Sequence, residues 1–150
     1  MLLNQRGSSL TLLLGTAVLL FTLVLSINYW LRQDLRIKEA YADNGKAFYL
    51  SEAGVEEALW HLAHNYNLEN TFFTSGIEGY GTYSTEITNI ERIQPLPENE
   101  EEPDGILIAT INSLGSANGA RERIITKVEL TYGWDGSISF KTASFQRAVP

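Results

Sequence analysis

Two histidines and a glutamate lie at helical spacing near residue 60 and are the first candidates for chemistry. Glu57 precedes His61 by four residues, and His64 follows three residues later. On a helix, this spacing would bring a carboxylate and two imidazoles together on neighbouring turns, as a shared metal ion requires. The same positions are near the end of the expected helix, where exposed histidines commonly complement the helix dipole. We therefore predict no metal site here.

A run of acidic side chains at residues 95–105, PLPENEEEPDG, is the second candidate. It contains three of the four prolines and five acids, which are Glu98, Glu100, Glu101, Glu102 and Asp104. Carboxylate oxygens are calcium ligands, but an EF-hand loop spaces its ligands at alternate positions around a fixed glycine. This run lacks that spacing. We interpret it as a solvated loop without calcium.

Other signals of catalysis or of nucleic-acid binding are missing from the sequence. The 150 residues include no cysteine, which excludes a disulfide, a thiol nucleophile and a thiolate metal site. We find no Ser/His/Asp grouping, no glycine-rich phosphate loop and no nucleotide motif. The net charge is −7 at pH 7, whereas a nucleic-acid surface needs clustered Lys and Arg. We predict that the chain is not an enzyme, takes no cofactor and binds no nucleic acid.

The dominant feature of the chain is an apolar run at residues 7–31, GSSLTLLLGTAVLLFTLVLSINYWL. These 25 residues include no charged side chain, and every acidic residue of the chain follows them. A bilayer core of about 30 Å is crossed by roughly 20 helical residues. In lipid, the backbone must satisfy its own hydrogen bonds. We predict a single transmembrane helix at residues 8–31, preceded by a short segment at residues 1–7.

Three kinds of N-terminal segment fit such a run: a cleaved secretory signal, a plain membrane anchor, and an anchor processed at its front end. A secretory signal has an apolar region of about 7 to 15 residues with a small-x-small cleavage site directly behind it. Here the apolar region is longer than that of a secretory signal. The A-x-A sequence, residues 40–42, lies beyond several charged residues. The two anchor interpretations are therefore favoured.

The residues after the span predict an amphipathic continuation of the same helix at residues 32–66. Apolar side chains recur there at helical spacing. They are Phe48, Val55, Leu59, Leu62 and Tyr66, with Ala47, Gly54 and Ala58 beside them. Residues 43–45, Asp-Asn-Gly, predict a kink or a brief break. Since about 85 residues remain beyond the helix, the core is small, and we expect the helix to pack into it.

The last segment, residues 67–150, predicts a small antiparallel sheet with one face on the helix. Four strands are expected, joined by Asn- and Gly-rich turns, and the segment directly after the helix is expected to be a loop. The strands are residues 82–93, 106–113, 121–132 and 137–145, with turns at residues 115–119 and 133–136. The clearest alternation runs from Ile124 to Tyr132. The predicted fold class is therefore α+β, with a long N-terminal helix and a C-terminal sheet.

Three short motifs occur along the chain. Residues 5–10 are QRGSSL, a short basic segment ending in glycine before the apolar run, and residues 47–58 are AFYLSEAGVEEA. Ser113-Leu114-Gly115 precedes Arg121-Glu122-Arg123. These motifs resemble the leader, the A-x-x-x-A-E-A-G-x-E-x-A helix and the S-x-G turn with its following strand in type IV prepilins, and most closely in the PilX-type minor pilins and pseudopilins. The resemblance covers residues 1–66 and is weaker over the sheet.

This resemblance implies that prepilin peptidase cuts between Gly7 and Ser8 and that Ser8 becomes an N-methylated N-terminus. Leu12 is a departure, because these proteins usually carry a glutamate there that pairs with the N-terminal amine of a neighbouring subunit. A leucine cannot make that contact, so the resemblance implies a minor subunit, in a tip or priming complex. Gly15 and Ala17 are small enough to let neighbouring helices approach, although ordinary membrane helices also carry such residues.

The expected partners are prepilin peptidase, other pilin or pseudopilin subunits, an inner-membrane assembly platform and membrane lipid. The expected location is the inner membrane, with the C-terminal domain outside the cytoplasm, and then a pilus or pseudopilus. Counting Lys and Arg alone favours the reverse orientation, because Arg32, Arg36 and Lys38 follow the span. A rival interpretation is a single-pass anchored binding module with no role in assembly.

Overall fold

The computed structural model describes residues 3–148, with side chains from Ser9 onward. The order of elements is one helix and five strands. They are α1 (Leu3–His64), β1 (Thr71–Ile77), β2 (Gly81–Gln94), β3 (Gly105–Ala117), β4 (Ala120–Tyr132) and β5 (Ile138–Ala148). The chain divides into two units, Met1–Tyr41 and Ala42–Pro150, and α1 contributes to both. The predicted α+β class, a long N-terminal helix packed on an antiparallel sheet, is confirmed.

The helix runs without the predicted break at residues 43–45. A glycine and a helix-breaking Asp-Asn pair weaken a helix locally, but here Asp43 makes compensating contacts. Its carboxylate accepts a hydrogen bond from the Asn118 side chain at 3.0 Å and pairs with Lys46 at 3.3 Å. These bonds hold the turn in helical form. The break was therefore wrongly predicted.

The helix ends at His64, two residues before the predicted end. The amide of Asn65 still donates to the carbonyl of His61, at 3.1 Å. Arg92 of β2 then binds the departing chain, donating to the carbonyls of Tyr66 at 3.1 Å and Leu68 at 2.8 Å. Both carbonyls lie in the connection between α1 and β1, outside the helix and the sheet. A cation from the sheet therefore stabilises the exit of the chain from α1.

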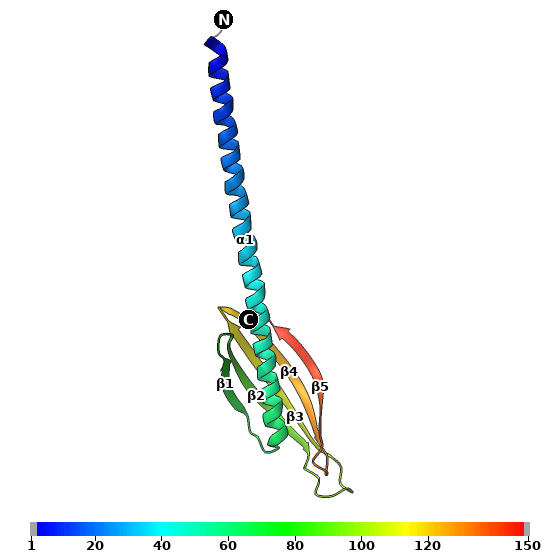
Figure 1. Ribbon diagram of the computed structural model, residues 1–150. Helices are drawn as coiled ribbons and strands as arrows, with labels where there is room; N and C mark the ends of the chain where they lie inside the picture. Colours follow the sequence, from blue (N-terminus) through cyan, green and yellow to red (C-terminus); the bar gives the residue numbers. More distant parts are fainter. Residues whose placement is uncertain (1–2, 149–150) are drawn as a thin grey trace. The chain divides into compact units, whose positions relative to one another are not determined.

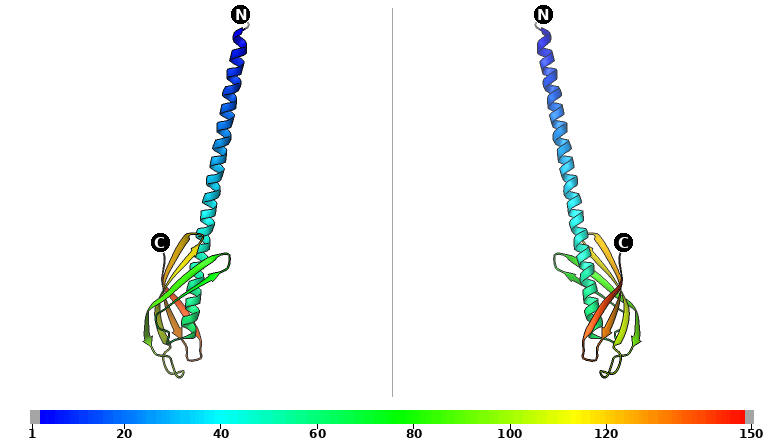
Figure 2. Two further views of the ribbon diagram at one scale, coloured as in Figure 1. Left: turned by 90° about the vertical axis from the view of Figure 1, so that its left-hand side faces the viewer. Right: turned by 90° about the vertical axis from the view of Figure 1, so that its right-hand side faces the viewer.

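The five strands form one sheet in the order β1-β2-β3-β4-β5, and every neighbouring pair is antiparallel. Residues 42–64 of α1 lie along one face of this sheet (Figure 1). In both views of Figure 2, no other described element covers the opposite face. The strands thus lie in the sheet in the same order as in the sequence, and the helix covers one face of that sheet.

The sheet differs from the prediction in one strand and several boundaries. β1 occupies Thr71–Ile77, which we expected to be a loop; its Thr and Phe residues favour a strand, but three nearby glycines obscured this signal. β3 extends to Ala117, so Ser113-Leu114-Gly115 lies inside a strand and not in a turn. The turn itself is Asn118-Gly119, with φ angles of 48° and 88°. Positive φ at both central residues gives the hairpin a twist that matches its strands.

The alternation predicted from Ile124 to Tyr132 is confirmed. Every second residue of β4 from Glu122 to Tyr132 is buried under the helix. The core beneath residues 42–64 draws mainly on β2, β3 and β4, and its members are Ala58, Leu62, Ile87, Leu107, Ala109, Ile111, Val128, Leu130 and Tyr132. β5 lies outside this core, and its residues 138–147 are all exposed.

Candidate functional site

The apolar segment of α1 is exposed along its length. Every residue from 9 to 33 is exposed, and α1 is the one helix of the described chain that is long and apolar enough to cross a membrane. Its polar side chains bond back to the helix. Thr16, Thr22, Ser26 and Asn28 each donate to a carbonyl three or four residues earlier, at 2.8 to 3.0 Å. This arrangement suits an apolar solvent, which offers such groups no other partner.

The residues predicted to act in assembly lie on this exposed segment. Leu12 is 70% exposed, Ala17 is exposed, and a Cβ built on Gly15 would meet no atom within 4 Å. The predicted cleavage and methylation residues, Gly7 and Ser8, belong to the backbone of α1, but their side chains lie outside the described residues. The geometry at Gly15 and Ala17 is compatible with a closely approaching helix.

The second unit is organised around a close contact between α1 and the sheet. The fully buried stripe of the helix consists mostly of small residues, which are Ala47, Leu50, Ser51, Gly54, Ala58 and Leu62. The larger side chains predicted for this stripe, Phe48, Val55 and Leu59, are only half-buried at its edges. Val55 and Leu59 pack against the core from its edge, and Leu62 of the predicted stripe is fully buried. The small residues of the stripe lie where the helix is closest to the sheet.

Two glycines make this approach possible. A Cβ on Gly54 would collide with the hydroxyls of Thr85 and Ser113, which are themselves joined by a buried hydrogen bond of 3.0 Å. A Cβ on Gly115 would collide with the backbone of the helix at Ala47 and Ser51. Gly54, Ser113 and Gly115 are motif residues in the sequence, and the structure places all three at the same contact.

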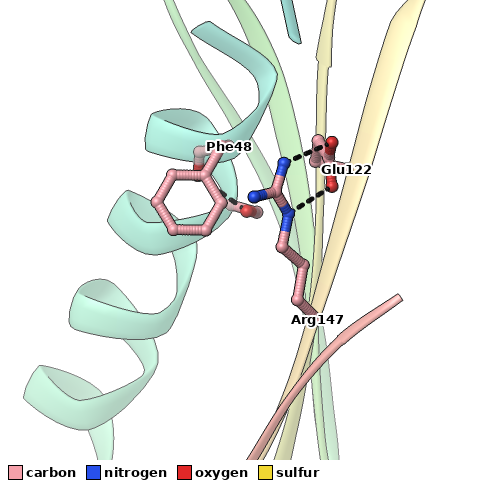
Figure 3. A network of polar contacts seen from close by, with 4 residues as sticks. Phe48, Glu122 and Arg147 are labelled. Atoms are coloured by element: carbon pink, nitrogen blue, oxygen red, sulfur yellow. Dashed lines mark hydrogen bonds and ion pairs between the residues drawn. The ribbon is translucent and has the colours of Figure 1, made fainter. Parts of the chain in front are cut away.

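An ion pair between a buried carboxylate and a half-exposed guanidinium connects the edge of the sheet to this contact (Figure 3). Glu122 of β4 is 4% exposed, and its carboxylate accepts two hydrogen bonds from Arg147 of β5, at 2.7 and 3.1 Å. The guanidinium lies 4.9 Å from the ring centroid of Phe48 on α1, a cation–π distance. Hydrogen bonds from Arg147 lower the pKa of Glu122, although desolvation opposes this shift.

Glu122 and Arg147 were not predicted as a pair. The sequence did contain a signal for Glu122, because the alternation from Ile124 to Tyr132, continued backwards, turns Glu122 inward. A charge at an inward position requires a partner. The sequence did not identify Arg147 as that partner, because β5 contains an extra residue opposite β4. Lys127 pairs with Ser144, whereas the next residue, Val128, pairs with Thr142, and this shift changes which side chains of β5 face the helix.

The histidines and Glu57 make separate contacts and do not converge. His64 stacks on Trp60, with ring centroids 4.4 Å apart, and His61 lies 5.3 Å from the ring of Phe73. The carboxylate of Glu57 accepts a hydrogen bond from the Tyr83 hydroxyl at 2.7 Å. Among the described residues, no group of three or more His, Cys, Asp or Glu side chains is placed to hold a metal ion.

The acidic loop at residues 95–104 bonds mainly to itself. The carboxylate of Glu102 accepts hydrogen bonds from the amide of Glu98 at 2.9 Å and from the side chain of Asn99 at 3.3 Å. The amide of Glu101 donates to the Asn99 side chain at 3.0 Å. These bonds are typical of a solvated turn.

Two surface hollows flank the helix in the second unit. One, of about 280 Å³, lies between residues 52–59 of α1 and the strands β4 and β5. The other, of about 220 Å³, is lined by Lys46, Tyr49, Leu50, Ile77 and Tyr80. Neither contains the convergent catalytic groups of an enzyme site.

Comparison of the chain with protein-family models, with curated proteins and with solved structures finds no match in any of the three.

Proposed function

We propose that the chain is a minor pilin- or pseudopilin-like structural subunit of a type IV pilus or of a filament related to type II secretion. One observation carries the proposal: a single uninterrupted helix, Leu3–His64, combines an exposed apolar segment with a segment packed on an antiparallel sheet. A filament subunit needs both parts. The apolar segment is held in the bilayer before assembly and packs against other helices afterwards, which keeps its surface from water at about 25 cal/mol per Å².

The helix–sheet contact supports this proposal independently of the apolar segment. The residues that resemble the pilin motifs, Gly54 on α1 and Ser113 and Gly115 on β3, are those that allow the helix to lie close to the sheet. The resemblance is therefore tied to a physical requirement of the fold.

In this proposal, the N-terminus is processed and the function is mechanical. Prepilin peptidase removes residues 1–7, Ser8 is methylated, and an inner-membrane platform adds the subunit to a filament with its sheet domain outside the cytoplasm. The protein needs no cofactor, is not an enzyme and binds no nucleic acid. Its partners are other pilin-like subunits and membrane lipid.

The intact mass and the N-terminal sequence of membrane-extracted protein test the proposal. In cells with prepilin peptidase we expect loss of residues 1–7 and a methyl group on Ser8; in cells without it we expect an intact chain. Gly7→Glu should remain uncut, whereas Gly15→Ala, in the same helix, should be cut like the unaltered protein. An uncut N-terminus in both strains contradicts the proposal.

The minor position within the filament has its own test. We attribute it to Leu12, where a charge-pairing carboxylate is missing. Leu12→Glu should be tolerated or should move the protein into the filament shaft, as quantified by the copy number in purified filaments. If the unaltered protein is already the most abundant subunit, the minor role is wrong.

The rival function is a single-pass anchored binding module without a role in assembly. The two surface hollows of the sheet domain favour it, because they offer packing sites for a separate ligand. This alternative expects an intact Met1 and the same surface abundance in cells that lack the filament machinery.

A further inference from the structure

The hollow between residues 52–59 of α1 and the strands β4 and β5 is a groove with an apolar floor and one acidic side. Val55 and Leu59 of α1 line it together with Phe145 of β5. Phe145 is 56% exposed and its neighbour on the same side of β5, Phe140, is 67% exposed. β5 is an edge strand with residues 138–147 all exposed, and among its helix-side residues Arg147 contacts α1 at Phe48. The groove is therefore an apolar surface that the fold leaves open.

The acidic side of the groove consists of Glu52 and Glu56, one helical turn apart. In the part of the chain that the structure describes, neither carboxylate has an ion-pair or hydrogen-bond partner. This distinguishes them from Glu57, which binds Tyr83, and from Glu122, which binds Arg147. The groove thus presents two unpaired negative charges beside two apolar side chains, all at helical spacing.

A matching surface occurs elsewhere in the same chain, on residues 31–36 of α1. Leu31 and Leu35 are 49% and 59% exposed, and Arg32 and Arg36 are exposed as well. No ion pair involves either arginine among the described residues, whereas nearby Lys38 is already paired with Asp34 at 2.7 Å. Leucines and arginines each repeat at a spacing of four residues, as do Val55/Leu59 and Glu52/Glu56.

We propose that the groove binds residues 31–36 of a second copy of this chain. Leu31 and Leu35 of that copy pack on Val55 and Leu59, and its two arginines face Glu52 and Glu56. The leucines supply the buried area, whereas the exposed ion pairs mainly select the partner and fix the register. Because the contact joins two different surfaces, a pair of copies bound in this way leaves one of each surface free.

This inference rests on the proposed function, because a filament is what places the helix of one copy beside the domain of another. To the proposed function it adds one contact between subunits and the side chains that form it. It predicts that the assembly contains at least two adjacent copies of this chain.

The absence of native cysteine makes disulfide trapping a clean test. Leu35→Cys and Val55→Cys are expressed as two separately tagged full-length chains in cells with the filament machinery, and filaments are oxidised and analysed by mass. We expect a disulfide between the two tags. Tyr41→Cys is the matched control, since Tyr41 is 74% exposed on the same helix and lines neither hollow. It should give at least about tenfold less cross-linked product, because a disulfide requires Cα atoms within about 7 Å.

Charge reversal tests whether the carboxylates and arginines meet. Glu52→Lys with Glu56→Lys in the Val55→Cys chain should reduce trapping about tenfold, since like charges then face each other. Arg32→Glu with Arg36→Glu in the Leu35→Cys chain should restore it. The melting temperature of each full-length variant in detergent checks that the substitutions leave the fold intact.

The outcomes separate this inference from the proposed function. The inference is overturned, and the proposed function stands, if the protein is cut, methylated and incorporated into filaments but shows no groove-specific trapping. The same holds if trapping occurs but charge reversal leaves it unchanged. Groove-specific trapping in a chain that keeps Met1 and forms no filament supports the contact and overturns the proposed function.

Discussion

Gly115 of β3 lies directly beneath the backbone of α1 at Ala47. A Cβ at this position would lie 2.6 Å from the amide nitrogen of Ser51 and closer still to the carbonyl oxygen of Ala47. Backbone atoms of a helix cannot move aside as a flexible side chain can. The separation between helix and sheet is therefore set by the absence of a side chain at residue 115.

Gly115→Ala should destabilise the sheet domain by about 3 kcal/mol, the upper range for overpacking a tight core. Gly45→Ala is the matched control, because a Cβ there meets no atom within 4 Å and alanine favours the helix by up to about 1 kcal/mol. Thermal unfolding of the full chain in detergent, followed by near-ultraviolet circular dichroism, measures both changes. Equal stability of the two variants would contradict the close contact.

Thr85 and Ser113 should show strong coupling in a double-mutant cycle. Their hydroxyls bind each other in a fully buried position under Gly54. Thr85→Val alone leaves the Ser113 hydroxyl unpaired and should cost about 1–2 kcal/mol, because a buried polar group then lacks its partner. Ser113→Ala should cost much less stability in the Thr85→Val protein than it costs in the unaltered protein. Denaturant titration of the four proteins measures the coupling, and simple additivity would count against a direct bond.

The Glu122–Arg147 pair should make the sheet domain sensitive to acid. Because the folded pKa of Glu122 is lowered by Arg147, its stabilising contribution is complete above the pKa of the unfolded carboxyl. It is lost as the pH falls through the folded pKa. Glu122→Gln should flatten this part of the pH–stability profile, as measured by melting temperature against pH.

Arg147→Met should be more damaging than Glu122→Gln at neutral pH. It leaves a buried carboxylate without its cation, whereas Glu122→Gln leaves a half-exposed guanidinium that water can solvate. Without Arg147, burial raises the folded pKa of Glu122. Acidification should then reduce the difference between Arg147→Met and the unaltered protein. A difference that stays constant with pH would show that only packing on Phe48 had been lost.

Tyr132 should control stability at high pH. Its hydroxyl donates to the carbonyl of Leu62 at 2.6 Å, and burial raises its pKa from 10.0 to about 12. The stabilising contribution of the neutral phenol is therefore complete below pH 10 and is lost as the pH rises toward 12. Tyr132→Phe should cost about 1 kcal/mol at neutral pH but resist alkaline unfolding better than the unaltered protein. Equal alkaline midpoints would contradict this assignment.

Periodicity and turn chemistry predicted the class of the fold and most of its elements. The apolar run fixed the first part of the helix, and the strict alternation from Ile124 to Tyr132 identified the inner face of β4. Neither signal depends on the rest of the chain. β1 was missed because its strand-forming residues lie among Asn and Gly, and pairing with β2 decides their conformation.

The helix–sheet contact was harder to predict because it depends on a distance between elements. Apolar periodicity predicted a stripe through Phe48, Val55 and Leu59 with Ala47 and Gly54 beside it. In the structure, those three larger side chains are half-buried, whereas Ala47 and Gly54 are fully buried together with Ser51, which was not predicted. Ser51 is polar, yet its hydroxyl donates to the carbonyl of Phe48 at 2.7 Å, so it is buried without an unsatisfied group. Which helix residues are buried depends on how closely the helix approaches the sheet, and that distance depends on Gly54 of α1 and Gly115 of β3 together.

The meander order of the sheet has a consequence for how this domain folds. Each strand finds its partner immediately before or after it in the chain, so every pairing closes only a short loop. Pairings of low contact order form quickly. The sheet can grow one hairpin at a time in the order of synthesis, and the acid-rich connection between β2 and β3 is the longest loop that must close. A domain without any cysteine therefore requires neither an oxidant nor a disulfide isomerase to reach its native state.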